Sequence, residues 1–306
     1  MTVIDAHCHI YPEKIASRAV DAVGEFYAFP KGGLGTQMAG EGTPESLLAA
    51  REKSPITHFL VHSVATTARS VQTINNFLAE QQSLHPEFIA FGTMHPDVED
   101  KEAEVNRALE LGLHGFKLHP DTQAVAMDDP RLMEFYEIIQ GRVPVVIHTG
   151  DYRYDYSSPA RLKKVLRAFP ELAVDAAHFS GWSIYDRGFD AMHADDARDL
   201  AIEERLFVDS SSTVRLVGAR HLAELVHMWG ADRVMFGSDS PMWDPALEYE
   251  EQILAQPTGT SCPITTSISP TTTLWPWSSR WCPPPACTRT TPRPIPGPTV
   301  PKTTTT

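Results

Sequence analysis

The chain has few cysteines and no long apolar run, and each shortage excludes a class of protein. Three of its four cysteines lie beyond residue 255, so the rest of the chain has only Cys8 and no disulfide framework. No apolar run is long enough to cross a bilayer, and the start MTVIDAHCHI lacks the basic segment of a secretory signal. We therefore expect a cytoplasmic protein.

Basic residues are scarce as well. The formal net charge is −13, and residues 1–255 hold 22 basic and 39 acidic residues. Such an acidic body repels nucleic acid and anionic membranes. We therefore expect a small-molecule substrate, with neither nucleic acid nor a membrane as a partner.

Acidic residues are absent from the segment 256–306, where 27 of 51 positions are proline or threonine. No helical or strand period survives there, so we expect a disordered tail. The change of composition interrupts a helix that begins in PALEYEEQILA (245–255). A Pro/Thr-rich stalk is one interpretation, and we favour an out-of-frame coding error. Resequencing the locus tests this hypothesis, and an intact frame through residue 306 would reject it.

Residues 1–255 contain strand-like apolar runs that alternate with amphipathic segments. We expect helices over 71–82, 102–112, 128–141 and 157–169. We expect strands near 3–8, 57–64, 88–93, 114–119, 143–149, 172–178, 206–210 and 233–238. This alternation predicts a single (β/α)8 barrel domain. An open doubly wound sheet is the alternative, but the first strand is not followed by the glycine-rich phosphate turn of that fold.

Three segments that follow predicted strands are long. The segment 29–45 is glycine-rich and is a candidate lid, whereas 151–158 and 179–190 are rich in aromatic residues. In a barrel, all three would lie on the face formed by the carboxyl ends of the strands.

Side chains that can bind metal stand at the ends of the predicted strands. His7 and His9 are two residues apart, so both would face the same side of a strand, and Asp5 could orient one imidazole. The others are Lys117, His148, His178 and Asp239. A barrel would bring them to one face, around a divalent metal ion.

Each of these residues also has an ordinary structural interpretation. His148 interrupts an apolar run, where an unpaired imidazole would be costly, so ligation is favoured. His178 could instead be a core histidine, and Asp239 could cap the turn that follows it. The other histidines are assigned ordinary structural or surface roles, although two of them end strands and could line the floor of the pocket: His62 and His95.

Five motifs in this order resemble the amidohydrolase superfamily, and its amidohydrolase-2 group of metal-dependent hydrolases and decarboxylases most closely. They are DAHCH (5–9), GFKLHP (115–120), IHTGD (147–151), AHFSGW (177–182) and FGSDSP (236–241). The resemblance covers residues 1–255 and implies that His7, His9, His148 and Asp239 bind the metal. It further implies that Asp239 takes a proton from water, and that His178 binds a second metal or polarises a substrate carbonyl.

The resemblance leaves the number of metal ions open. A carboxylated Lys117 would bridge two ions, whereas an unmodified lysine would bind substrate beside one, which we favour. Zinc is the first expectation, with manganese or iron as alternatives. His119, Arg153 and Trp182 are further candidates for substrate contacts. Relatives in this family also suggest a homodimer.

The sequence therefore predicts a metal-dependent hydrolase of a small amide, lactone or ester. The alternative is non-oxidative decarboxylation of an aromatic or unsaturated acid at the same metal site, which the aromatic loops favour. A third interpretation is a barrel that has lost its activity. Metal content measured before and after His148→Ala distinguishes this last case.

Overall fold

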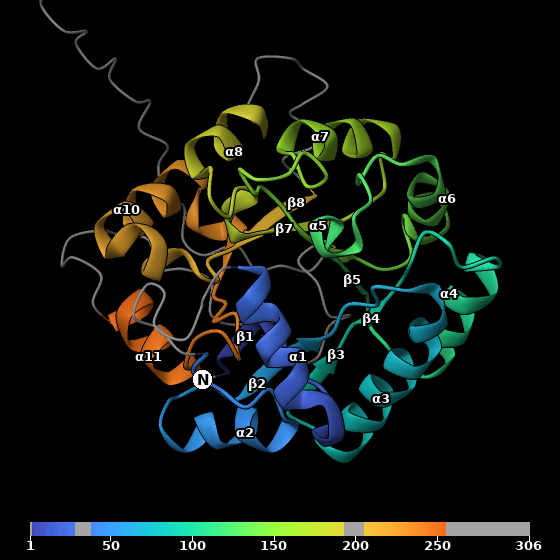
Figure 1. Ribbon diagram of the computed structural model, residues 1–306. Coiled ribbons are helices and arrows are strands. Elements are labelled where there is room, and N and C mark those ends of the chain that lie inside the picture. Colours follow the sequence, from blue (N-terminus) through green and yellow to red (C-terminus); the bar gives the residue numbers. More distant parts are fainter. Residues whose placement is uncertain (1, 28–37, 193–204, 255–306) are drawn as a thin grey trace, which may run out of the picture.

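Parallel strands form the centre of the molecule in the computed structural model, which describes residues 2–27, 38–192 and 205–254 (Figure 1). The strands in these ranges are β1 (Ile4–His9), β2 (His58–His62), β3 (Phe88–Ala90), β4 (Gly92–Thr93), β5 (Phe116–Leu118), β6 (Val145–His148), β7 (Val174–Ala177), β8 (Leu206–Asp209) and β9 (Val234–Met235). They pair in sequence order, as β1-β2-β3 and as β4-β5-β6-β7-β8-β9.

Backbone hydrogen bonds close these two sheets into one barrel. Phe91 N donates to Val61 O over 2.9 Å and Gly92 N donates to Gly115 O over 2.9 Å, so β3 and β4 are two parts of one predicted strand. At the other seam, Ala6 N donates to Phe236 O over 2.8 Å. The eight-stranded barrel expected from the sequence is therefore confirmed, with its third strand interrupted at Phe91.

Helices surround the strands (Figure 1). They are α1 (Glu13–Phe26), α2 (Pro44–Leu48), α3 (Val71–Leu84), α4 (Lys101–Glu110), α5 (Pro120–Gln123), α6 (Pro130–Ile139), α7 (Pro159–Ala168), α8 (Tyr185–Met192), α10 (Thr213–Trp229) and α11 (Pro245–Tyr249), with short turns η2 (Ala49–Glu52), η3 (Ala68–Ser70), η4 (His178–Ser180), η5 (Ala231–Arg233) and η6 (Glu250–Leu254). The four helices expected from the sequence are α3, α4, α6 and α7. The segment 179–190, expected as a loop, instead contains most of α8.

Local sequence explains where the helices begin. The Asp129 side chain accepts a hydrogen bond from Arg131 N at the start of α6, with Pro130 in the first turn. The Asp100 side chain caps α4 in the same way, by accepting from Ala103 N. These caps fix the helices against the outside of the barrel.

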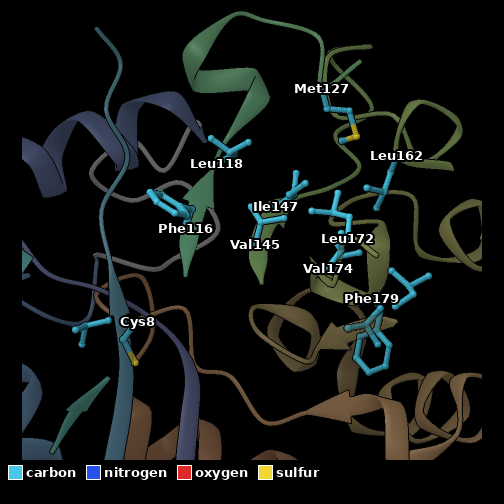
Figure 2. Packing of buried hydrophobic residues seen from close by; sticks show 14 of the residues in the cluster. Cys8, Phe116, Leu118, Met127, Val145, Ile147, Leu162, Leu172, Val174 and Phe179 are labelled. Carbon is cyan, nitrogen blue, oxygen red and sulfur yellow. The ribbon is translucent and has the colours of Figure 1, made fainter. Parts of the chain in front are cut away.

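Two apolar layers hold the barrel together. Figure 2 shows part of the outer layer, to which neighbouring strands contribute Phe116, Ile147 and Val174 and α7 contributes Leu162. The inner layer fills the barrel itself and consists of Ala6, Leu60, Phe91, Val146, Ala177, Phe207 and Met235. Because this layer is packed, the polar strand ends above it form a floor rather than a pore.

Two predictions concern segments outside the described ranges. Most of the candidate lid 29–45 and the whole tail 256–306 lie there, so both remain predictions. Among the helices of the described ranges, none combines the length and the apolar composition that a membrane crossing requires.

Candidate metal centre

The first strand, β1, carries an irregularity beside its two histidines. The register with β2 shifts between Asp5 and Cys8, as in a β-bulge. Asp5 accepts hydrogen bonds from the backbone N–H groups of His7 (3.2 Å) and Ser238 (2.9 Å). Asp5 therefore joins β1 to the segment that follows β9. Because both of these hydrogen bonds are to backbone N–H groups, the expectation that Asp5 orients an imidazole is wrong.

Asp209, at the end of β8, orients the His7 imidazole instead. Its Oδ2 accepts a hydrogen bond from His7 Nδ1 over 2.7 Å, which leaves a lone pair on His7 Nε2. Burial by itself would raise the pKa of Asp209, but the contact with His7 holds that pKa below its usual value. Burial lowers the pKa of His7 to about 4, so this imidazole is neutral and able to bind a metal.

The Asp239 carboxylate lies beside both histidines of β1. Its Oδ1 is 3.7 Å from His7 Nε2 and 3.5 Å from His9 Nε2, while its Oδ2 accepts a hydrogen bond from Ser212 Oγ over 2.5 Å. Asp239 adopts a left-handed backbone conformation, with φ 65°, which is costly for a residue with a side chain. This conformation turns the carboxylate toward the imidazoles rather than toward the turn that follows.

Lys117 is fully buried beside the His7 imidazole. Its Nζ is 3.2 Å from His7 Nε2. Burial lowers the pKa of this ammonium group to about 8, although Asp209 and Asp239 act in the opposite direction. A lysine of this kind is readily neutralised, and so could either contact substrate or be carboxylated.

His178 connects Ser211 to His148. Its Nδ1 lies 2.7 Å from Ser211 Oγ and 3.1 Å from Ser211 O, and its Nε2 lies 3.1 Å from His148 Nδ1. Because a backbone carbonyl only accepts, His178 Nδ1 carries the proton, and His178 Nε2 accepts from His148 Nδ1. This relay leaves the lone pair of His148 on Nε2, which has no hydrogen-bond partner within the described ranges.

The His178 ring lies between His148 and the histidine pair of β1. The His178 ring is 4.9 Å from the His7 ring and 4.8 Å from the His148 ring. On its other side, His148 stacks on His119 at 3.9 Å, and its Nε2 is 3.6 Å from Asp121 Oδ2. His7, His9 and Asp239 therefore lie together, whereas His148 belongs to a separate group with His119 and Asp121, whose ligating atoms lie within 4.8 Å of one another.

The donors at this end of the barrel suit a divalent metal ion. His7, His9 and His62 offer ring nitrogens that all lie within 4.8 Å of one another. Asp209 and Asp239 keep low pKa values, so two buried negative charges face a single buried ammonium, that of Lys117. Neutral imidazoles with an excess of carboxylate are a chemically suitable set for such a cation.

Aromatic residues cover the metal-binding end. Tyr27, which follows α1, lies 4.7 Å from the Trp182 ring, and its hydroxyl is 2.7 Å from His119 Nε2. Arg153 forms a two-pronged ion pair with Asp151 and donates to Phe26 O over 2.6 Å. Arg153 therefore fastens the end of α1 over the strand ends, while Trp182 and His119 form a wall.

The sequence pattern of a family described as amidohydrolase matches residues 4–266. The chain is a member of the amidohydrolase family. The resemblance noted in the sequence is thereby confirmed, and the chain is an enzyme of a metal-dependent family. Among curated proteins, none matches this sequence.

Solved structures share the fold of this amidohydrolase. An uncharacterized TIM-barrel protein from Bordetella bronchiseptica is 19% identical, with TM-score 0.64, over 84% of this chain and 92% of that one. A 5-carboxyvanillate decarboxylase from Novosphingobium aromaticivorans, complexed with manganese and a nitrobenzoic acid, is 16% identical, with TM-score 0.61, over 82% and 89%. A dihydroxybenzoic acid decarboxylase from Polaromonas sp. JS666, with bound manganese and 2-nitroresorcinol, is 17% identical, with TM-score 0.57, over 88% and 92%.

Two residues of this amidohydrolase site were not identified from the sequence. Asp209 ends the predicted strand 206–210, so the rule that strand ends carry function could have found it. His62 ends the second strand, and the sequence favours an ordinary role for it or a place at the floor of the pocket rather than a ligand role. Its ring instead lies 4.7 Å from that of His7 and 4.5 Å from that of His9.

Proposed function

We propose that this amidohydrolase is a metal-dependent hydrolase of a small amide, lactone or ester. The observation that carries the proposal is the position of Asp239, whose Oδ1 is 3.5 Å from His9 Nε2 while Ser212 Oγ donates to its Oδ2. Hydrogen bonds of this kind favour the ionised carboxylate, which is the form that accepts a proton. A proton acceptor beside a metal site suits hydrolysis by water.

His7, His9, His148 and Asp239 would hold one divalent ion, most suitably zinc, given the imidazole-rich donors. When bound, such an ion supplies Lewis-acid polarisation of the substrate and acidifies water. Asp239 accepts the proton of the attacking water at a carboxylate oxygen. Lys117, whose Nζ lies 3.2 Å from His7 Nε2, donates a hydrogen bond to the developing oxyanion.

His178 acts in this proposal through His148. Both nitrogens of its ring are engaged, one by Ser211 and one by His148 Nδ1. His178 thus orients His148, and a direct contact of His178 with substrate would require this relay to open. With Lys117 unmodified, the set holds one ion, and carboxylation of Lys117 would allow two.

Non-oxidative decarboxylation of an aromatic acid is the second candidate function. The aromatic wall favours it, because the rings of Tyr27 and Trp182 lie 4.7 Å apart at the mouth of the barrel and suit a planar substrate. Two of the similar structures are decarboxylases with bound manganese, which also keeps manganese as an alternative to zinc. In this reaction, Asp239 or His178 would deliver a proton to carbon.

Isotope labelling distinguishes the two reactions on a panel of esters, lactones, amides and aromatic acids. Hydrolysis in H₂¹⁸O places solvent oxygen in the product, whereas decarboxylation in D₂O places deuterium on carbon and releases carbon dioxide. We expect solvent oxygen in the product and a loss of about 100-fold or more in kcat/KM for Asp239→Asn. Turnover of aromatic acids alone, with deuterium in the product, would replace hydrolysis by the second function.

Metal content provides an independent test of the site. We expect about one ion per chain in the purified enzyme, and loss of that ion in His148→Ala. Unchanged metal content in His148→Ala would remove His148 from the ligand set.

A further inference from the structure

The end of β2 places a third imidazole against the histidine pair of β1. His62 pairs in register with His9, and its side chain is completely buried. Its ring stands nearly perpendicular to both neighbours, at 82° to the His7 ring and 81° to the His9 ring. The three rings therefore face one another at the same end of the barrel.

Neither ring nitrogen of His62 has a hydrogen-bond partner within residues 2–27, 38–192 and 205–254. A buried imidazole offers one donor and one acceptor, and leaving both unmet costs free energy that a purely structural residue would avoid.

From this arrangement we infer that His62 is a further ligand of the metal ion that His7, His9, His148 and Asp239 are proposed to hold. The inference rests on the proposed metal site and adds a ligand to it. Ring nitrogens of His7, His9 and His62 already lie within 4.8 Å of one another, so small rotations of the rings converge them on one ion.

A fourth nitrogen donor changes which ion the centre selects. Four imidazoles and one carboxylate form a nitrogen-rich set, which favours zinc, cobalt or iron over magnesium and calcium. Zinc or cobalt should therefore bind in preference to a large excess of magnesium.

Substitution of His62 tests the inference by metal affinity. We expect His62→Asn to weaken Zn²⁺ and Co²⁺ binding by at least the roughly 10–100-fold that loss of an outer-shell partner causes. His95→Asn is the matched control, because His95 is also a buried histidine beyond a strand end, but its Nδ1 already accepts from Asp97 N over 3.2 Å. The control should bind both ions as the wild type does.

A second variant keeps the test valid if His62→Asn fails to fold. In Co²⁺-loaded His62→Cys, a thiolate ligand should add a cobalt–sulfur charge-transfer band beyond any that the four cysteines of the wild type give. Wild-type affinity in His62→Asn, or no new band in folded, cobalt-loaded His62→Cys, would overturn the inference. A wild-type enzyme that binds neither ion would instead overturn the proposed function.

Discussion

Asp209 shows how one carboxylate can position two of the histidines at this end of the barrel. Its carboxylate fixes the proton of His7 on Nδ1, over 2.7 Å, and also accepts from His178 N over 3.2 Å. One carboxylate therefore sets both the tautomer of one imidazole and the backbone position of another. Outer partners of this type raise the basicity of a ligand as well as fixing its direction.

Replacing this carboxylate by an amide should weaken the centre. In Asp209→Asn, the amide can turn its NH₂ group toward His7 and favour the wrong tautomer, so we expect metal affinity to fall by roughly 10–100-fold. Competition with a chelating dye measures the change. Asp232→Asn, at a largely exposed carboxylate on η5, is the control and should leave affinity unchanged. Equal affinities in the two variants would mean that Asp209 does not orient His7.

The loops that follow β6 and β7 position His148 and His178, and they meet at two glycines. Gly150 has φ 81°, and a Cβ added there would stand 2.5 Å from Gly181 Cα. Trp182 N donates to Thr149 O over 2.9 Å, which holds the two loops together. The spacing of the two histidines thus depends on this close backbone approach.

Alanine at Gly150 should therefore strain its own backbone and also push the loop at Gly181 away. Gly218 in α10 provides the comparison, because it has φ 80° but no atom within 4 Å of an added Cβ. Gly218→Ala should cost only the conformational strain, roughly 1–3 kcal/mol in the free energy of unfolding. Gly150→Ala should cost more and should also lower kcat/KM, as urea unfolding and steady-state kinetics would measure. Matching losses in both variants would show that the contact with Gly181 is unimportant.

At the level of elements, the sequence predicts what depends on local pattern. Buried parallel strands are continuous apolar runs, and helices such as α4 and α6 begin after a capping Asp, so most of the barrel could be predicted. The helix α8 was missed because YDRGFDAM includes Gly188, which has low helix propensity. The roles of His62 and Asp209 were missed because they depend on register and on barrel closure, which join residues 53 or more positions apart.

For the molecule as a whole, the concentration of buried carboxylate at one end of the barrel predicts that stability depends on metal. Asp209 and Asp239 are buried and held ionised, and Lys117 is the one fully buried ammonium in the described part of the chain. A cation that binds only the folded state therefore adds stability as its concentration exceeds Kd.

Removal of the metal should accordingly lower the melting temperature. An ion at about 100 times its Kd adds roughly 2.7 kcal/mol to the free energy of unfolding. Each kcal/mol shifts Tm by about 2–4 °C in a domain of this size, so chelation should lower Tm by roughly 5–10 °C. Differential scanning calorimetry before and after chelation measures this fall, and added zinc should reverse it. Asp239→Asn should melt at the same temperature with and without zinc, because a proposed ligand is gone. A wild-type Tm that chelation leaves unchanged would show that no ion contributes to this fold.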